Sequence, residues 1–207
     1  MSKGTEIPRK SIYRLSIYQR CLERLKENGV ETVSSNALAK AAGVKSTQLR
    51  KDLAHFGQFG TRGLGYNVEA LNEVITGVLG TNSLQPVILV GVGNLGAALS
   101  RYNGFGKEGF EISAAFEKSP DRRASVKAGV PILPSDQMSA FVREHGVKMA
   151  ILAVPAEAAQ TVTNELVAAG VQAILNFSPS MLKVPEDVIV NSVDLALELE
   201  HLSYFVK

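Results

Sequence analysis

Apolar residues are spaced in two different ways along the chain, and the change occurs near residue 80. In the first region they recur every three or four positions, which is the spacing of an amphipathic helix. The longest such segment spans residues 9–28 and stops before Gly29, a residue type that commonly ends helices. This segment predicts a core helix whose apolar stripe consists of Ile12, Leu15, Tyr18 or Gln19, Leu22 and Leu25.

Two shorter helices are predicted next, at residues 34–43 (SSNALAKAAG) and residues 44–57 (VKSTQLRKDLAHFG). Each has a residue suited to an N-cap and a glycine that can end it. These are Ser34 or Ser35 and Gly43 for the first helix, and Ser46 and Gly57 for the second. Two short helices joined by a tight, glycine-containing turn predict a helix-turn-helix.

The following segment, QFGTRGLGY at residues 58–66, has three glycines around Arg62. This arrangement suits a tight hairpin or wing. Residues 67–80 return to helical spacing, and residues 81–85 are rich in the residue types found in linkers.

The second region contains continuous apolar runs separated by amphipathic segments. This alternation predicts a parallel sheet covered by helices on both faces. The apolar runs lie at residues 86–91, 110–117, 149–155, 172–178 and 188–193, and helical patterns lie at residues 136–145 and 156–170. The last stretch predicts a helix whose leucines and aromatic residues cover either their own domain or another subunit.

We therefore expect an α/β protein with two cores. Its parts are a winged helix-turn-helix domain at residues 1–80, a linker at 81–85, a Rossmann-like domain at 86–193 and a C-terminal helix at 194–207. A length of 207 residues suits a small domain followed by a medium one.

Composition narrows the class of protein. No apolar run approaches the roughly 20 residues of a membrane span, and the first residues lack the apolar core of a secretory signal. We therefore expect a cytoplasmic protein without a membrane partner. Cys21 is the single cysteine, so it cannot form an internal disulfide, and no cysteine or histidine lies near it at the spacing of metal ligands. We expect no metal site.

The net charge of +2 conceals an asymmetry between the two regions. Residues 1–80 hold 12 Lys and Arg against 7 Asp and Glu, whereas the remainder holds 10 against 13. An excess of basic residues raises the expectation of a nucleic-acid partner for the first region.

The segment PVILVGVGNLGAALSRY contains the glycine pattern of a dinucleotide-binding loop. Gly91, Gly93 and Gly96 follow an apolar strand and open a helix, and Glu117 ends the next strand. Such glycines allow a tight turn, the approach of pyrophosphate and close helix–strand packing. An acidic residue at this strand end accepts hydrogen bonds from ribose and favours NAD over NADP, although Lys118 beside it is basic.

The chain offers little for dehydrogenase chemistry, which needs a proton donor or acceptor beside the transferred hydride. None of the histidines, His55, His145 and His201, follows a strand where nicotinamide would lie. Short-chain reductases require a lysine four residues after their catalytic tyrosine, and Tyr102 has no lysine at that spacing. We therefore expect no catalytic residues and no enzyme.

The second short helix has the two faces that a recognition helix requires. Leu49, Leu53 and Phe56 would face inward, and a polar N-terminal half would enter the major groove. Arg62 on the wing would reach a minor groove. The residues that we expect on the DNA-facing side are Ser46, Thr47, Gln48, Arg50, Lys51 and Arg62.

Four motifs in this order resemble the Rex family of redox-sensing transcriptional repressors, over nearly the whole chain. They are RKDLxxFGxxGTRGxGY (residues 50–66), VGxGxLGxAL (90–99), AVP (153–155) and NFSP (176–179). The resemblance implies a homodimer with a winged helix, a Rossmann domain and a final helix exchanged between subunits. It implies binding to palindromic operator DNA and release when NADH binds, so that NADH and NAD⁺ are sensed ligands.

The resemblance also implies roles for single residues. Tyr102 is similar to a tyrosine near the nicotinamide, and Arg20 and Asp194 resemble a pair from opposite subunits that reports the ligand state. Most members carry Asp-x-Asp where this chain has Glu117-Lys118-Ser119, and an aromatic residue where it has His55. The expected cofactor-binding residues are Gly91, Val92, Gly93, Asn94, Leu95, Gly96, Tyr102, Glu117, Lys118, Val154, Pro155, Asn176 and Ser178.

Two other hypotheses are a small NAD-dependent oxidoreductase with a basic accessory domain and a nucleotide-binding scaffold whose winged helix contacts proteins. An oxidoreductase would turn the cofactor over, whereas a sensor would only bind it. The scaffold would show no salt-dependent DNA binding.

Overall fold

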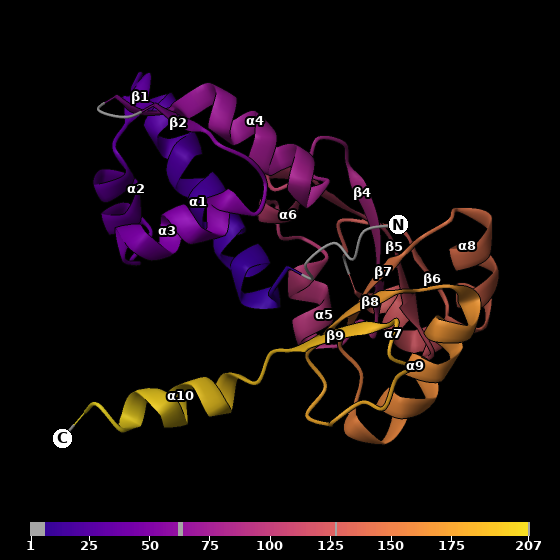
Figure 1. Ribbon diagram of the computed structural model, residues 1–207. Coiled ribbons are helices and arrows are strands. Elements are labelled where there is room, and N and C mark those ends of the chain that lie inside the picture. The colour runs from indigo at the N-terminus through magenta and orange to yellow at the C-terminus, as the bar shows by residue number, and fades with distance from the viewer. Residues whose placement is uncertain (1–6, 62–63, 127, 207) are drawn as a thin grey trace. The chain divides into compact units, whose positions relative to one another are not determined.

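The computed structural model describes residues 7–61, 64–126 and 128–206. Its chain divides into two compact units, Met1–Ser83 and Leu84–Lys207 (Figure 1). Each unit has its own hydrophobic core. The first unit contains α1 (Arg9–Glu27), β1 (Thr32–Val33), α2 (Ser35–Ala41), α3 (Ser46–Ala54), β2 (Gly60–Thr61), β3 (Gly65–Asn67) and α4 (Val68–Leu79).

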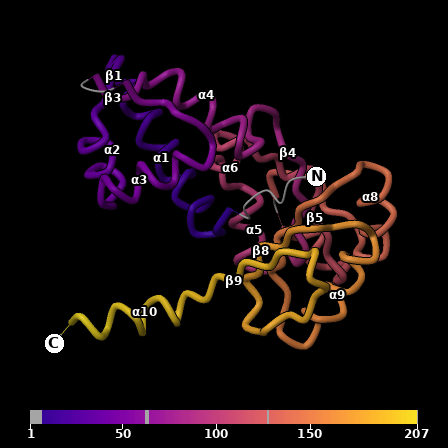
Figure 2. Tube along the Cα trace, in the orientation of Figure 1, coloured from indigo at the N-terminus to yellow at the C-terminus, as the bar shows by residue number. Residues whose placement is uncertain are grey.

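The first unit is a winged helix, as predicted. The predicted stripe of α1 packs on α2, α3 and α4, with Leu15, Tyr18 and Leu22 fully buried. The wing strands β2 and β3 are antiparallel, and β1 pairs with the other side of β3. Figure 2 shows β1 and β3 next to each other. The sequence patterns missed β1 because its two residues are too few to show a period.

The second unit alternates strands and helices. Its elements are β4 (Gln85–Val90), α5 (Asn94–Leu99), α6 (Gly104–Lys107), β5 (Phe110–Glu117), α7 (Pro120–Ser125), β6 (Ile132–Pro134), the 3-10 helix η1 (Ser135–Gln137), α8 (Met138–Glu144), β7 (Met149–Leu152), α9 (Ala156–Ala169), β8 (Ala173–Asn176), β9 (Ile189–Ser192) and α10 (Leu195–Ser203).

Within the described residues the second unit holds a six-stranded parallel sheet of order β6-β5-β4-β7-β8-β9. Alternate residues of β4 face opposite cores: Ile88 and Val90 pack with α8 and α9, and Val87 and Leu89 pack on the other face. The predicted Rossmann-like fold is confirmed. The chain crosses from one side of β4 to the other between β6 and β7, which creates a switch point between β4 and β7.

The apolar runs of this region predict five strands, and β6 is not among them. This edge strand has three residues and pairs only with β5, over Ala115–Glu117. It ends in Pro134, a residue type that sheets accept at edges. The pairing partner, and not the strand's own residues, therefore makes this segment a strand.

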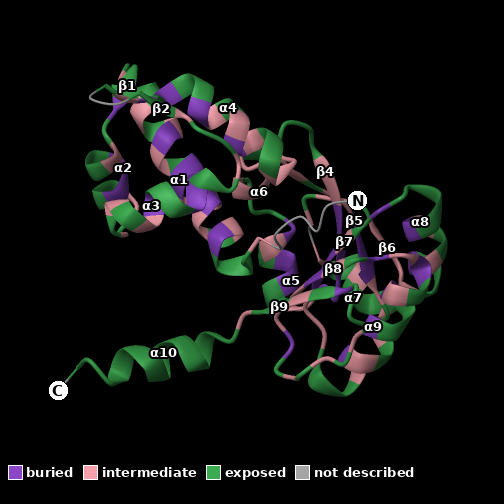
Figure 3. Ribbon diagram, in the orientation of Figure 1, coloured by how far each residue is buried: buried purple, intermediate pink, exposed green. Residues whose placement is uncertain are grey.

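The C-terminal helix α10 follows β9 directly and is exposed over its whole length (Figure 3). Its large apolar side chains are 57–68% exposed, at Leu195, Leu197, Leu199 and Leu202. The predicted helix is therefore present, and the residues that the structure describes leave its apolar side chains uncovered.

Candidate nucleotide and DNA sites

The glycine loop after β4 has backbone positions that only glycine fits. Gly91 adopts a φ of +91°, and a Cβ there would lie 2.5 Å from the carbonyl oxygen of Ala153. A Cβ on Gly96 would overlap the carbonyl oxygen of Gly91, so α5 packs directly on the loop. These are two of the roles expected from the motif: the tight turn and the close approach of helix and strand.

Gly93 differs from the other two glycines because the space around it is open. The single heavy atom near a Cβ on Gly93 would be Nη1 of Arg122, at 3.6 Å. Gly93 precedes the first residue of α5, and Asn94 and Leu95 after it are exposed. Exposed backbone at the start of a helix is the feature that lets a phosphate approach this type of loop.

Glu117 lies at the end of β5, and its carboxylate is bonded to the glycine loop. Oε2 accepts a hydrogen bond from the backbone N–H of Val92 at 2.8 Å, and Oε1 accepts one from Ser119 at 2.9 Å. Val92 is fully buried: its side chain packs in the core and its N–H donates to Glu117. Lys118 is exposed beside this carboxylate.

Asn176 and Ser178, at the end of β8, are both buried. The Asn176 amide donates to the carbonyl oxygens of Ser178 and Ser180 and to Oγ of Ser192, and its Oδ1 accepts from the N–H of Ser178. These bonds favour an indirect role for Asn176, which is to hold the loop after β8 in shape.

The expected nicotinamide-side residues come from two segments. Val154 and Pro155 follow β7, and a Cβ on Gly91 would lie 2.9 Å from Cγ1 of Val154, so this segment lies against the glycine loop. The ring of Tyr102 is 61% exposed and packs edge-to-face on Phe105 at 5.1 Å. Glycine at position 104 leaves the space that this ring occupies.

Helix α3 has the division of faces that was expected. Leu49 and Leu53 are buried and Phe56 is partly buried, whereas Thr47, Arg50 and Lys51 are exposed. Arg50 donates to Oγ of Ser35 on α2 at 3.0 Å.

The prediction that Ser46 caps α3 is wrong. Lys45 is the N-cap residue, because the N–H groups of Gln48 and Leu49 both donate to its carbonyl oxygen. Ser46 is the first helical residue. The N-cap of α2 is Ser34, whose hydroxyl accepts from Ala37 at 3.1 Å.

The wing arginine, Arg62, lies outside the described residues. The strands on either side of it are paired, with Thr61 opposite Gly65. A cavity of about 570 Å³ lies between α3 and these strands, and its lining includes Arg50, Leu53, Phe59 and Tyr66.

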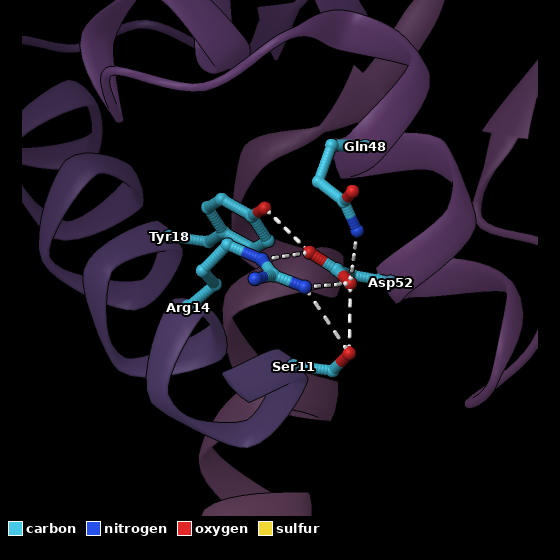
Figure 4. A network of polar contacts seen from close by, with 5 residues as sticks. All are labelled: Ser11, Arg14, Tyr18, Gln48 and Asp52. Atoms are coloured by element: carbon cyan, nitrogen blue, oxygen red, sulfur yellow. Dashed lines mark hydrogen bonds and ion pairs between the residues drawn. The ribbon is translucent and has the colours of Figure 1, made fainter. Parts of the chain in front are cut away.

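Asp52 on α3 is a residue that the sequence analysis missed. Its side chain is buried and accepts hydrogen bonds from two helices (Figure 4). The donors are Oγ of Ser11 (2.9 Å), Nε and Nη2 of Arg14 (2.5 and 2.6 Å), Oη of Tyr18 (2.8 Å) and Nε2 of Gln48 (2.9 Å).

The charge of Asp52 is stabilised by these donors. Burial acts to raise the pKa of Asp52, but the hydrogen bonds from Arg14, Tyr18, Ser11 and Gln48 outweigh it and lower the pKa to about 2. The hydrogen bond to Asp52 raises the pKa of Arg14. An ionised pair therefore joins α1 to α3.

Arg20 and Asp194 lie in different units. Arg20 is an exposed residue of α1. Asp194 is the N-cap of α10, and its Oδ1 accepts from the N–H groups of Ala196 and Leu197 at 2.9 and 3.1 Å. Asp194 therefore has a local structural role whether or not it meets an arginine of another subunit.

Among the residues that the structure describes, no three His, Cys, Asp or Glu side chains gather as metal ligands would. No helix in the same residues has the length and apolar character needed to cross a membrane.

Each unit is similar to a known protein family. A family described as "Putative DNA-binding protein N-terminus" matches residues 6–54, and one described as "CoA binding domain" matches residues 81–180. A protein of Syntrophomonas wolfei named redox-sensing transcriptional repressor Rex is 49% identical over 204 residues, which cover 99% of this chain and 97% of the relative.

Solved structures of RSP, a Rex-family repressor, are similar over both units. RSP in complex with β-NAD⁺ and operator DNA has a TM-score of 0.90 and 38% identity, covering 98% of this chain and 93% of RSP. RSP in complex with β-NADH has a TM-score of 0.86 and 37% identity, covering 98% and 95%.

Proposed function

Because this chain belongs to the Rex family of redox-sensing transcriptional repressors, we propose that it binds palindromic operator DNA as a homodimer and is released when NADH binds. The observation that carries the nucleotide half of this proposal is the glycine loop. Its Gly91 and Gly96 have no room for a Cβ, and Gly93 leaves backbone open to a phosphate.

The roles of the parts follow the order of the chain. Residues 1–80 bind DNA, residues 86–193 bind NADH or NAD⁺, and residues 194–207 are exchanged between subunits. Exposed apolar side chains along α10 support the exchange, because a soluble protein rarely leaves such a surface uncovered. A protein of this kind would act in the cytoplasm.

In the DNA-binding unit, Arg50 and Lys51 on α3 are exposed and positively charged, as major-groove or phosphate contacts require. Ser46, Thr47 and Gln48 lie on the first turn of the same helix. Together with Arg62 they form the proposed DNA-binding set.

In the nucleotide-binding unit, the loop at residues 91–96 would hold the pyrophosphate and Glu117 the adenosine ribose. NADH differs from NAD⁺ by the absence of a positive charge on the nicotinamide ring. Burial of an unpaired charge is costly, so apolar walls from Phe105, Val154 and Pro155, with Tyr102 beside them, would favour neutral NADH.

Binding of NADH would regulate DNA affinity through the dimer. Two recognition helices match successive half-sites only at a spacing of about 34–36 Å. A change in dimer angle on NADH binding would break that match, and a coupling of about 1–3 kcal/mol gives roughly 5- to 150-fold regulation.

The test is a titration of labelled palindromic DNA with the full-length protein, alone and with NADH, NAD⁺ or NADP⁺. We expect salt-dependent DNA binding that NADH weakens most. DNA binding that ignores all three nucleotides would contradict the proposal. Incubation with NADH and carbonyl substrates would reveal an oxidoreductase, because only an enzyme consumes the cofactor.

A further inference from the structure

Among the expected DNA contacts that the structure describes, Gln48 alone has a side chain bonded to a fully buried residue. It lies on the first turn of α3, is half-buried, and donates from Nε2 to Oδ1 of Asp52, one helical turn later (Figure 4). Thr47 and Lys51 of the same helix are exposed.

Asp52 determines which way the Gln48 amide faces. An ionised carboxylate can only accept hydrogen bonds, whereas a glutamine amide has an accepting and a donating end. If the amide were reversed, its oxygen would face Oδ1 of Asp52, and two acceptors would oppose each other. Ser11, Arg14 and Tyr18 hold the carboxylate in place from α1, so it cannot turn away.

The outward atoms of Gln48 are therefore known. Oε1 has no hydrogen-bond partner among the described residues. Nε2 carries two N–H groups, and the one that does not donate to Asp52 is also available to a ligand. An oxygen that must face outward is poorly suited to a phosphate, because both groups are acceptors. It suits a base edge that presents an amino group.

We propose that Asp52 is a positioning residue that orients Gln48 to read adenine in the major groove. Oε1 of Gln48 accepts from the N6 amino group, and the remaining N–H donates to N7. Guanine and thymine would place an acceptor against Oε1, and cytosine lacks a neighbouring acceptor for the N–H. This inference rests on the proposed DNA-binding function.

The experiment is selection of binding sites from a random duplex library by the full-length protein without NADH. We expect the wild-type protein to enrich a palindrome. Each half-site should contain one adenine whose enrichment depends on Gln48. In Gln48→Met, which keeps the length of the side chain without its polar atoms, the preference for this adenine falls at least fivefold. Preferences at the other positions remain.

Asp52→Asn tests the orientation, because an asparagine can donate as well as accept and lets the Gln48 amide reverse. We expect guanine or thymine to become tolerated at the same position. Tyr18→Phe is the matched control: it removes one hydrogen bond, but Ser11 and both nitrogens of Arg14 still hold the carboxylate, so stability falls and the adenine preference stays.

The outcomes separate the inference from the function on which it rests. An unchanged adenine preference in Gln48→Met, or a guanine or thymine at the Gln48-dependent position of the wild type, would overturn the inference alone. Loss of the adenine preference in folded Tyr18→Phe would overturn the orienting role of Asp52. If the wild type enriches no sequence, the proposed function fails as well.

Discussion

Arg14 and Asp52 form an ion pair between α1 and α3 in which Nε of Arg14 lies 2.5 Å from Oδ2 of Asp52. The Asp52 side chain is 1% exposed and the Arg14 side chain 20%. Removal of one partner would leave the other charge without compensation in a poorly hydrated place, which is strongly destabilising. The pair therefore connects the stability of the winged helix to pH.

We predict acid destabilisation that depends on Asp52. Its pKa is lowered from 3.8 to about 2 in the folded protein, so its contribution is complete above pH 4 and is lost as pH falls through 2. The shift corresponds to about 2 kcal/mol. Urea unfolding between pH 7 and 2 should show this loss in the wild type and a smaller one in Asp52→Asn.

The matched control is Glu69→Gln. Glu69 forms an exposed ion pair with Lys26 at 2.9 Å, and exposed pairs contribute little. This variant should keep the pH dependence of the wild type. If acid lowers the free energy of unfolding equally in Asp52→Asn and in the wild type, another group is responsible for the loss.

Gly96→Ala should weaken nucleotide binding strongly. A methyl group there would overlap the carbonyl oxygen of Gly91. The backbone of α5 fixes the position of the methyl group and the oxygen is itself a backbone atom, so neither can swing away. We expect at least a tenfold loss of NADH affinity by calorimetry and a lower melting temperature. Gly77→Ala, in α4 with open space around it, is the control. It should leave NADH affinity unchanged and should not lower the melting temperature, because alanine favours a helix more than glycine does. Normal NADH binding by Gly96→Ala would contradict the proposed loop.

Gly104→Ala should displace the ring of Tyr102 without disturbing the fold. The atoms that a Cβ would overlap belong to the far end of a flexible side chain, which can swing away. If Tyr102 acts in nucleotide sensing, NADH affinity should change at least threefold, and this change should disappear in a Tyr102→Ala background.

Gly106→Ala is the control for that prediction, because Gly106 lies in the same short helix and has open space around it. It should bind NADH like the wild type. An effect of Gly104→Ala that persists without the Tyr102 ring would mean that the ring is not its cause.

Asp194→Asn should separate the capping of α10 from the proposed switch. Asparagine caps helices about as well as aspartate, so the hydrogen bonds to Ala196 and Leu197 can persist while the charge is lost. If Asp194 reports the ligand state by pairing with Arg20 of another subunit, NADH should no longer weaken operator binding. An NADH response like that of the wild type would refute this charge-based switch.

Arg62→Ala should weaken operator binding and leave NADH affinity almost intact, because the wing belongs to the DNA-binding unit. Salt dependence is measured as the slope of the logarithm of the DNA-binding constant against the logarithm of the salt concentration. Loss of a single phosphate or minor-groove contact should reduce this slope by about one. Gel-shift titrations at several salt concentrations and NADH calorimetry provide the two measurements. Reduced NADH affinity with normal DNA binding would place Arg62 elsewhere in the mechanism.

Local patterns in the sequence predicted most helices and the central strands. The stripe from Leu15 to Leu22, the apolar run of β4 and the spacing of Gly91, Gly93 and Gly96 are each encoded within a few turns or one strand. Hydrophobic burial and backbone sterics act on such short segments directly, so the two-unit α/β fold and the glycine loop could be predicted from local patterns.

Tertiary structure alone decided the features that depend on distant partners. β6 is a strand because β5 pairs with it, and Asp52 is an anchor because Ser11, Arg14 and Tyr18 reach it from 34 to 41 residues away. An aspartate on a short helix looks like a solvated residue in the sequence. The packing of α1 on α3 removes Asp52 from water. Because Asp52 is then buried, its hydrogen bonds affect the stability of the unit and fix the direction in which the Gln48 amide faces.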